Sequence, residues 1–165
     1  MGNKPLTKLG KDVLDTMGEI GMALDVAHAS KAALAQMLAH AKARPFCSHG
    51  GVVGAKKSWR NLPDDALKAI ADKGGVVGII FAPVFLGGKT FDDLARHLEH
   101  AVNVMGEEGV GLGSDFDGMI ALPKGMRDVR DLPKLTEVLL KRGHPVARIE
   151  KLLGGNFRRF FGEVL

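Results

Sequence analysis

Three apolar segments of this sequence each run into a side chain that can bind a metal or move a proton. One segment ends in His28, and a second ends in His49. The third, residues 110–118, reads VGLGSDFDG and carries Asp115 directly after its apolar part. Imidazole nitrogen is a common ligand of zinc, and a carboxylate can transfer a proton during hydrolysis. Two histidines and an aspartate in this arrangement indicate a metal-dependent hydrolase.

Other polar residues near these segments allow more than one interpretation. Arg60 can hold a carboxylate through two parallel hydrogen bonds, or it is a solvated cation beside Lys56 and Lys57. Asp25 lies three residues before His28, where it can either support a ligand histidine or end a strand. For Asp117 we favour a role in forming a turn over a role in catalysis.

The elements that must position these residues alternate along the chain. Strands are expected at residues 22–26, 46–48, 75–81 and 110–114, and helices at 8–19, 30–40, 63–74, 90–105, 133–143, 145–153 and 156–164. Ser30 is expected to cap one helix, and Thr90 with Asp93 to cap another. His97 and His100 fall on an amphipathic helix, at its surface or seam, and are interpreted as structural. For His40 and His144 we expect no role.

This order of elements predicts an α/β fold with a parallel sheet and right-handed crossovers. A flavodoxin-like open sheet is possible, but no glycine fingerprint for phosphate binding follows the first strand. Four βα units also make half of an eight-stranded barrel, in which chemistry is placed at the carboxyl ends of the strands. We therefore expect one domain, residues 1–165, folded as a parallel (β/α) half-barrel.

Composition narrows the classes of function. The 165 residues are 45% hydrophobic and 25% charged, with a formal net charge of +4, and they include one Trp and no Tyr. The basic residues form no single run, so we expect no nucleic-acid partner. No stretch is apolar enough to span a bilayer, so no membrane association is expected. Cys47 is the one cysteine and lies in a strand segment, which predicts a buried thiol, a reducing compartment and a cytoplasmic location.

Several short motifs occur together, in a fixed order, from Leu6 to the end of the chain. They are LDVAH at 24–28, SH at 48–49, RNLPDD at 60–65, KGGVV at 73–77, GLGSDFDG at 111–118 and LGGNF at 153–157. Together they resemble the membrane dipeptidase (renal dipeptidase) family of zinc metallopeptidases. Each motif is weakly diagnostic alone, but their order and spacing are specific.

The resemblance implies a complete (β/α)8 barrel with two zinc ions, of which this chain corresponds to the C-terminal four βα units. In the family the histidines matching His28 and His49 bind one zinc, the aspartate matching Asp115 moves a proton, and the arginine matching Arg60 binds substrate. The family's first strand carries a His-x-Asp pair, and a glutamate bridges the two metals. This sequence has no His-x-Asp pair. At most one zinc is therefore partly liganded by this chain.

The function implied is zinc-dependent hydrolysis of dipeptides, performed together with the N-terminal half of the barrel. The alternative is a non-catalytic half-barrel that acts as a subunit or an interaction fragment. A half-barrel leaves two edge strands, so we expect a homo-oligomer or a separate N-terminal half-barrel as partner. The sequence leaves the side-chain preference of the dipeptide open.

Overall fold

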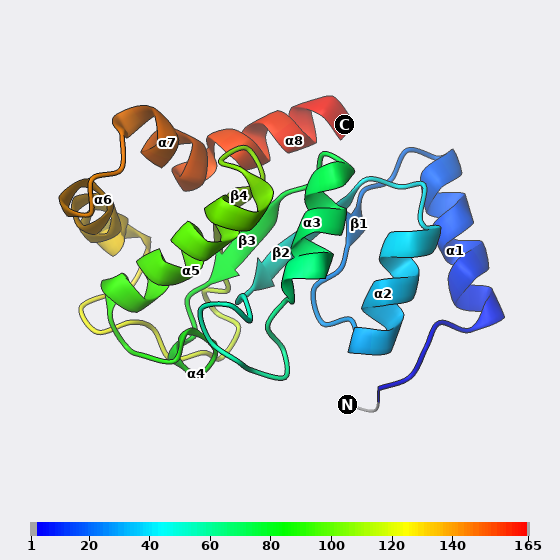
Figure 1. The fold of residues 1–165 in the computed structure, drawn as a ribbon, viewed down its shortest axis with the longest axis horizontal. Coiled ribbons are helices and arrows are strands. Elements are labelled where there is room, and N and C mark those ends of the chain that lie inside the picture. The colour runs from blue at the N-terminus through cyan, green and yellow to red at the C-terminus, as the bar shows by residue number, and fades with distance from the viewer. Residues whose placement is uncertain (1–2, 165) are drawn as a thin grey trace.

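The computed structural model describes residues 3–164, and its centre is one parallel sheet of four strands (Figure 1). The strands are β1 (Leu24–Asp25), β2 (Pro45–Gly50), β3 (Val77–Ile80) and β4 (Val110–Ser114), and they lie side by side in that order. A flavodoxin-like sheet would place the first strand between the second and the third. The sequential order is that of a (β/α) barrel, so the predicted half-barrel is confirmed.

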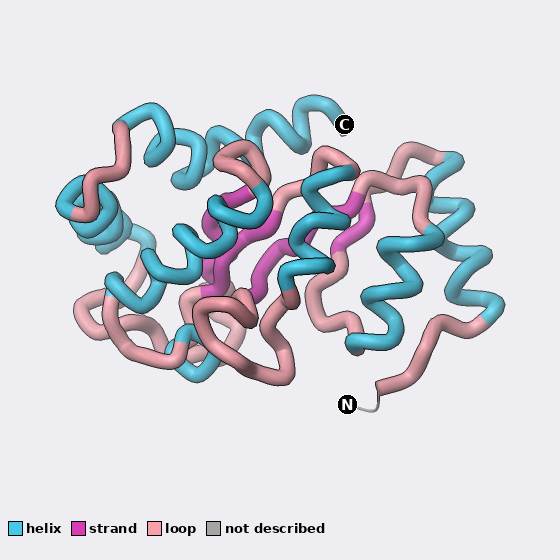
Figure 2. The backbone as a smooth tube through the Cα atoms, in the orientation of Figure 1, coloured by secondary structure: helices cyan, strands magenta, loops and turns pink. Residues whose placement is uncertain are grey.

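Helices follow the strands and cover the sheet. They are α1 (Lys8–Glu19), α2 (Lys31–His40), α3 (Asp64–Asp72), α4 (Pro83–Leu86), α5 (Phe91–Met105), α6 (Leu132–Lys141), α7 (Val146–Glu150) and α8 (Asn156–Val164). The long helices contact each other in chain order, from α1 through α2, α3 and α5 to α6. Figure 2 shows the strands in the middle of the molecule with helices arranged around them. This is the layering expected of consecutive βα units.

The helix starts follow from local sequence. The Ser30 side chain accepts a hydrogen bond from Ala33 N, as predicted. Thr90 and Asp93 form the predicted capping box at the start of α5. Other details differ from the predictions: β1 spans two residues, β2 is longer and β3 shorter than expected, the short helix α4 follows β3, and a kinked turn over Lys151–Gly155 separates α7 from α8. At Gly154 the backbone leaves helical geometry, with φ of 167° and ψ of −18°, so this segment is a kink between the two helices.

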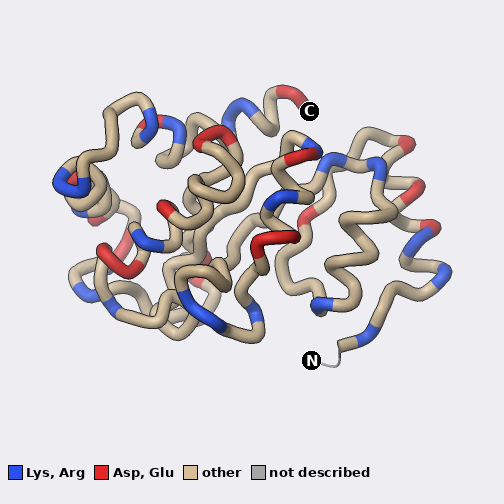
Figure 3. Tube along the Cα trace, in the orientation of Figure 1, with Lys and Arg blue, Asp and Glu red and all other residues tan. Residues whose placement is uncertain are grey.

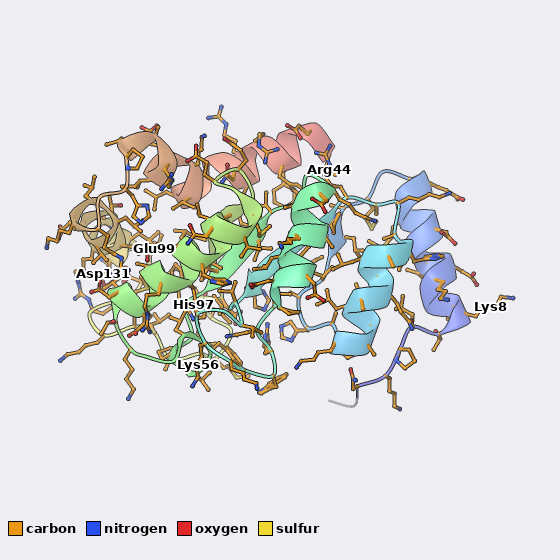
Figure 4. All side chains as sticks on the ribbon, viewed as in Figure 1. Lys8, Arg44, Lys56, His97, Glu99 and Asp131 are labelled. Carbon is orange, nitrogen blue, oxygen red and sulfur yellow. The ribbon has the colours of Figure 1, made fainter. Side chains whose placement is uncertain are left out.

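The C-terminal helix α8 packs against the amino-terminal ends of β2 and β4. Its Phe160 is fully buried, and the ring centroid lies 5.5 Å from that of Phe46 on β2. Arg44, just before β2, donates a hydrogen bond of 2.6 Å to Glu163 (Figure 4). Asn156 Nδ2 donates to the carbonyls of Glu107 and Val110, at 2.7 Å each. The helix therefore clamps the starts of β2 and β4.

Charges are mixed over the surface. Figure 3 shows basic and acidic residues interspersed along the helices and loops.

Within residues 3–164, no helix has both the length and the apolar content needed to cross a membrane. Large apolar side chains are exposed on and after α1, where Leu9, Val13, Ile20 and Met22 are each at least 50% accessible.

Candidate metal and substrate site

The two histidines predicted as metal ligands face each other at the carboxyl end of the sheet. His28 follows β1 and His49 lies near the end of β2, and these two strands are paired. The Nε2 atoms are 2.9 Å apart, and the ring centroids are 5.0 Å apart. Parallel topology explains this, because neighbouring strands end at the same edge about 4.8 Å apart. The structure therefore places two imidazole nitrogens where one ion can bind both.

The two other predicted residues join this pair. Asp115, directly after β4, has its Oδ1 atom 4.0 Å from His49 Nε2. Arg60, from the loop between β2 and α3, has Nη2 2.9 Å from His28 Nε2. The Arg60 guanidinium also lies over the ring of Phe85, with Cζ 5.4 Å from the ring centroid. All four candidate residues therefore meet at one place, although they come from three different strand ends.

A cavity opens beside these side chains. It has a volume of about 300 Å³ and is lined by His28, His49 and Arg60 together with Trp59 and the buried thiol of Cys47. Trp59 is 67% exposed and packs edge-on against Phe85. Burial raises the pKa of Cys47 to about 12, so its side chain is a neutral thiol. This confirms the prediction that Cys47 is a small buried residue.

Two of the four candidate residues, His28 and Asp115, have an unusual backbone conformation that orients their side chains. His28 and Asp115 adopt left-handed conformations, with φ of 63° and 74°. Non-glycine residues seldom do so, and such strain concentrates at functional sites. Among the described residues only three other non-glycine positions have positive φ, namely Ser114, Asp117 and Met119. All three flank Asp115, so the backbone strain is confined to the two loops that carry candidate chemistry.

Irregular strand pairing also lies next to the site. Between Cys47 and Gly50, β2 has one more residue than the facing part of β3, and His49 lies in this bulge. A second bulge occurs in β4 opposite Ile79 and Ile80, immediately before Asp115. An extra residue in one strand bends it and re-aims the side chains that follow. The bulges therefore direct His49 and Asp115 toward a common point.

The surroundings of His49 favour its neutral form. Burial lowers the pKa of His49, and the charges of Arg60 and His28 lower it further, while Asp115 acts in the opposite direction. A neutral imidazole has a free lone pair, which metal binding requires. Ser48 Oγ lies 2.8 Å from His49 Nδ1 and so occupies the nitrogen that points away from His28. This contact orients the ring with Nε2 toward its partner histidine.

The donor set fits part of a metal site. Two converging imidazole nitrogens beside a carboxylate are the donors that zinc prefers. Within residues 3–164, however, no three His, Cys, Asp or Glu side chains come close enough to hold an ion together. The described residues thus bring together two candidate nitrogen ligands, and a site with three or four ligands would need the others from elsewhere.

The loop that carries Arg60 is held by residues that the sequence did not mark as functional. Asn61 Nδ2 donates to the carbonyls of Lys56 and Phe85, at 2.7 and 3.0 Å. His97 on α5 accepts a hydrogen bond of 3.0 Å from Val52 N through Nδ1 (Figure 4). His97 is fully buried, which excludes the surface position and agrees with the expected seam position and structural role. In the sequence, Asn61 is marked only by its place beside Arg60 in the RNLPDD motif at 60–65.

The remaining candidates have structural partners. His100 Nε2 lies 2.7 Å from Asp64 Oδ1, at the start of α3. His40 pairs with Asp15, and His144 pairs with Glu99. These three histidines link helices and lie outside the cluster around His28 and His49.

Parallel strands in sequential order, with polar residues at their carboxyl ends, are the architecture of a (β/α) barrel. The chain belongs to the membrane dipeptidase family (peptidase family M19), whose family model matches residues 2–165. It is 35% identical over 162 residues to an uncharacterized dipeptidase of Schizosaccharomyces pombe. It is 36% identical over 166 residues to an uncharacterized protein in the pqqA 5' region of Klebsiella pneumoniae. The chain spans 40% and 61% of these relatives, which match 95% and 96% of it.

Solved structures give the same picture. A metallo peptidase from Rhodobacter sphaeroides, liganded with a phosphinate mimic of the dipeptide L-Ala-D-Ala, matches with a TM-score of 0.91 and 28% identity. The probable dipeptidase PvdM from Pseudomonas aeruginosa matches with a TM-score of 0.90 and 25% identity. These alignments cover 98% and 97% of this chain, and 48% and 55% of the other chains. The fold described here is thus about half of each longer relative.

Proposed function

We propose that this chain supplies the histidine, aspartate and arginine part of a zinc dipeptidase site. The observation that carries the proposal is the convergence of His28 and His49, whose Nε2 atoms are 2.9 Å apart, with Asp115 4.0 Å from His49. Membership of the dipeptidase family supports hydrolysis as the reaction class. The phosphinate dipeptide mimic bound to the Rhodobacter relative supports a dipeptide as the substrate class.

Each residue has a distinct task in this proposal. His28 and His49 would hold one zinc ion, which supplies Lewis-acid polarisation of the scissile carbonyl when bound. Arg60 binds the free carboxylate of the dipeptide with its planar guanidinium. Its present contact with His28 keeps it within reach of that position. Asp115 would accept a proton from the attacking water at one carboxylate oxygen and deliver it to the departing amine.

The number of candidate zinc ligands in this chain indicates whether it can be active without further residues. A catalytic zinc site usually has three protein ligands, and the described residues bring two histidines together. We therefore propose that turnover requires the N-terminal half of the barrel, supplied by other residues or another chain. The second candidate function is a non-catalytic subunit, which the missing third ligand among residues 3–164 favours.

One experiment separates these functions. The purified chain is analysed for bound zinc and assayed with a panel of dipeptides, alone and mixed with a separately produced N-terminal half. Zinc-dependent hydrolysis by the mixture supports the dipeptidase, and the same hydrolysis by the chain alone shows that two histidines suffice. Stable association without any turnover supports the subunit role instead.

A further inference from the structure

A carboxylate replaces a backbone carbonyl in the ladder between β1 and β2. The regular parallel ladder begins with hydrogen bonds from Leu24 N to Arg44 O and from Val26 N to Phe46 O. The next bond of this pattern would run from Ser48 N to the carbonyl of Val26. Instead, Ser48 N donates to Asp25 Oδ1 at 3.0 Å. The pairing of the two strands is thus continued by a side chain.

Because Ser48 N bonds the Asp25 side chain, the Val26 carbonyl is available for another hydrogen bond. It accepts a hydrogen bond of 3.2 Å from Ala29 N, which closes a four-residue turn. His28 is the third residue of this turn and has φ of 63°, a left-handed conformation that occurs at the third position of type II turns. Without an alternative acceptor for Ser48 N, β1 would continue past Val26, and His28 would not lie in this turn. The early end of β1 and the position of His28 are therefore linked.

The same oxygen atom also fastens the turn itself. Asp25 Oδ1 accepts a second hydrogen bond, of 2.9 Å, from Ala27 N. One oxygen therefore holds Ala27, which precedes His28, and Ser48, which precedes His49. The bond to Ala27 alone would be an ordinary Asx turn. The added bond to Ser48 connects the backbones of both histidine-bearing segments.

We propose that Asp25 is a positioning residue that sets the spacing between His28 and His49. It acts through the backbone amides of Ala27 and Ser48, and the structure gives it no hydrogen bond to either imidazole. This inference rests on the proposed function of the two histidines as ligands of one ion. The sequence allowed Asp25 either to support a ligand histidine or to end a strand. In this proposal Asp25 does both.

The test compares Asp25→Ala with Asp25→Asn, which keeps an acceptor oxygen at the same place. Asp128→Ala is the matched control, because Asp128 Oδ1 also accepts a hydrogen bond from the amide two residues later but lies in the β4–α6 loop. In Asp25→Ala we expect faster exchange of the Ser48 amide and loss of the NOE between the His28 and His49 rings. We also expect an affinity for Zn²⁺ lower by about tenfold or more, as for other supporting residues of metal ligands. Asp25→Asn should restore most of each signal.

The outcomes are separable from those of the proposed function. If the wild-type chain does not bind Zn²⁺, the proposed function fails, whereas the ring NOE and amide exchange still test Asp25. If Asp25→Ala does not fold, a second NMR measurement on the wild-type chain takes the place of the variant. It detects scalar couplings across the two hydrogen bonds, from the amide nitrogens of Ala27 and Ser48 to the carboxylate carbon of Asp25. The proposal is overturned if those couplings are absent. It is also overturned if Asp25→Ala keeps the ring NOE and the Zn²⁺ affinity, or if Asp128→Ala loses them equally.

Discussion

His49 and Asp115 approach each other across an intervening strand. The Nε2 and Oδ1 atoms are 4.0 Å apart, although β3 lies between the strands that carry them. Strands two places apart in a sheet are separated by about 9.6 Å, twice the usual spacing. The two side chains must therefore both lean over the end of β3. This leaning brings a candidate proton carrier next to the candidate metal ligands.

Removal of either histidine is expected to abolish zinc binding. His28→Ala or His49→Ala leaves one imidazole at the site, and a single ligand holds zinc poorly. Isothermal titration with Zn²⁺ measures the effect in the full chain. His40→Ala is the control, because His40 pairs with Asp15 away from the cluster. Equal loss of binding in the control would contradict the assignment.

Replacement of Arg60 by lysine is expected to weaken substrate binding. Lysine keeps the charge but loses the planar pair of donors, and a hydrogen bond to a charged group contributes about 1.5–3 kcal/mol. Arg60→Lys should therefore raise KM by roughly 10- to 100-fold in the chain assembled with its N-terminal half. Lys57→Ala removes a neighbouring cation of the same loop and should leave KM unchanged. A similar KM for Arg60→Lys and wild type would exclude the carboxylate contact.

Activity should depend on assembly and on Asp115. The chain alone is expected to show little or no hydrolysis of dipeptides, because its described residues bring together only two histidine ligands. In the assembled enzyme, Asp115→Asn should lower kcat by roughly 10²- to 10⁴-fold, the usual contribution of a proton-transfer group. Asp117→Asn is the comparison, and its kcat should stay near the wild-type value. Robust hydrolysis by the chain alone, lost in His28→Ala, would refute the dependence on assembly.

Acid should destabilise the chain through His97. The pKa of His97 is lowered from 6.5 to about 4, mainly by burial; the hydrogen bond to the Leu86 carbonyl and the charge of Asp93 oppose this, while the charges of Arg96 and His100 add to it. Between pH 6.5 and 4 the unfolded chain binds the proton more readily, so stability falls as the pH falls through this window. The full effect is about 3 kcal/mol at 1.36 kcal/mol per unit of pKa.

Urea unfolding at several pH values tests this contribution. His97→Gln keeps an acceptor for Val52 N and a donor for Leu86 O but does not titrate. Its stability should change less between pH 6.5 and 4 than that of the wild-type chain. Parallel curves for both proteins would show that another group causes the acid sensitivity.

The bulge before Asp115 should not tolerate a side chain. A Cβ atom at Gly113 would lie 2.5 Å from the carbonyl oxygen of Ser48 and 2.6 Å from that of Gly78. Gly113→Ala must therefore push β4 away from its neighbours, and we expect a loss of about 1–3 kcal/mol in unfolding free energy. Gly162→Ala, where a Cβ atom meets nothing within 4 Å, is the control. Equal stability of the two variants would contradict the close approach.

The sequence predicted those features that depend on local pattern or on topology. The caps at Ser30 and Thr90 follow from residues within one helical turn. The convergence of His28 and His49 follows from the rule that parallel strands share a carboxyl edge, so their positions at strand ends were sufficient. The roles of these residues as ligands stay a prediction.

Other features depend on contacts between segments that are distant in the sequence, so no local sequence pattern predicts them. The bulge around His49 is defined only by its pairing with β3. The burial of His97 depends on Val52 and Leu86, which approach it only in the folded chain. The hydrogen bond that Asp25 accepts from Ser48 N likewise joins two different strands. Such cross-strand relations set the fine geometry of the site.

The docking of α8 has a consequence for the order in which the molecule folds. Each strand pairs with the next one along the chain, so the four βα units can form one after another as the polypeptide leaves the ribosome. The ring of Phe160 then has to find Phe46, which was synthesised far earlier. Closure of this longest loop is expected to be the last and slowest step. Until it occurs, Phe46 lacks its contacts with Phe160 and Phe161, and nascent chains halted before α8 are expected to be retained by chaperones at this apolar surface.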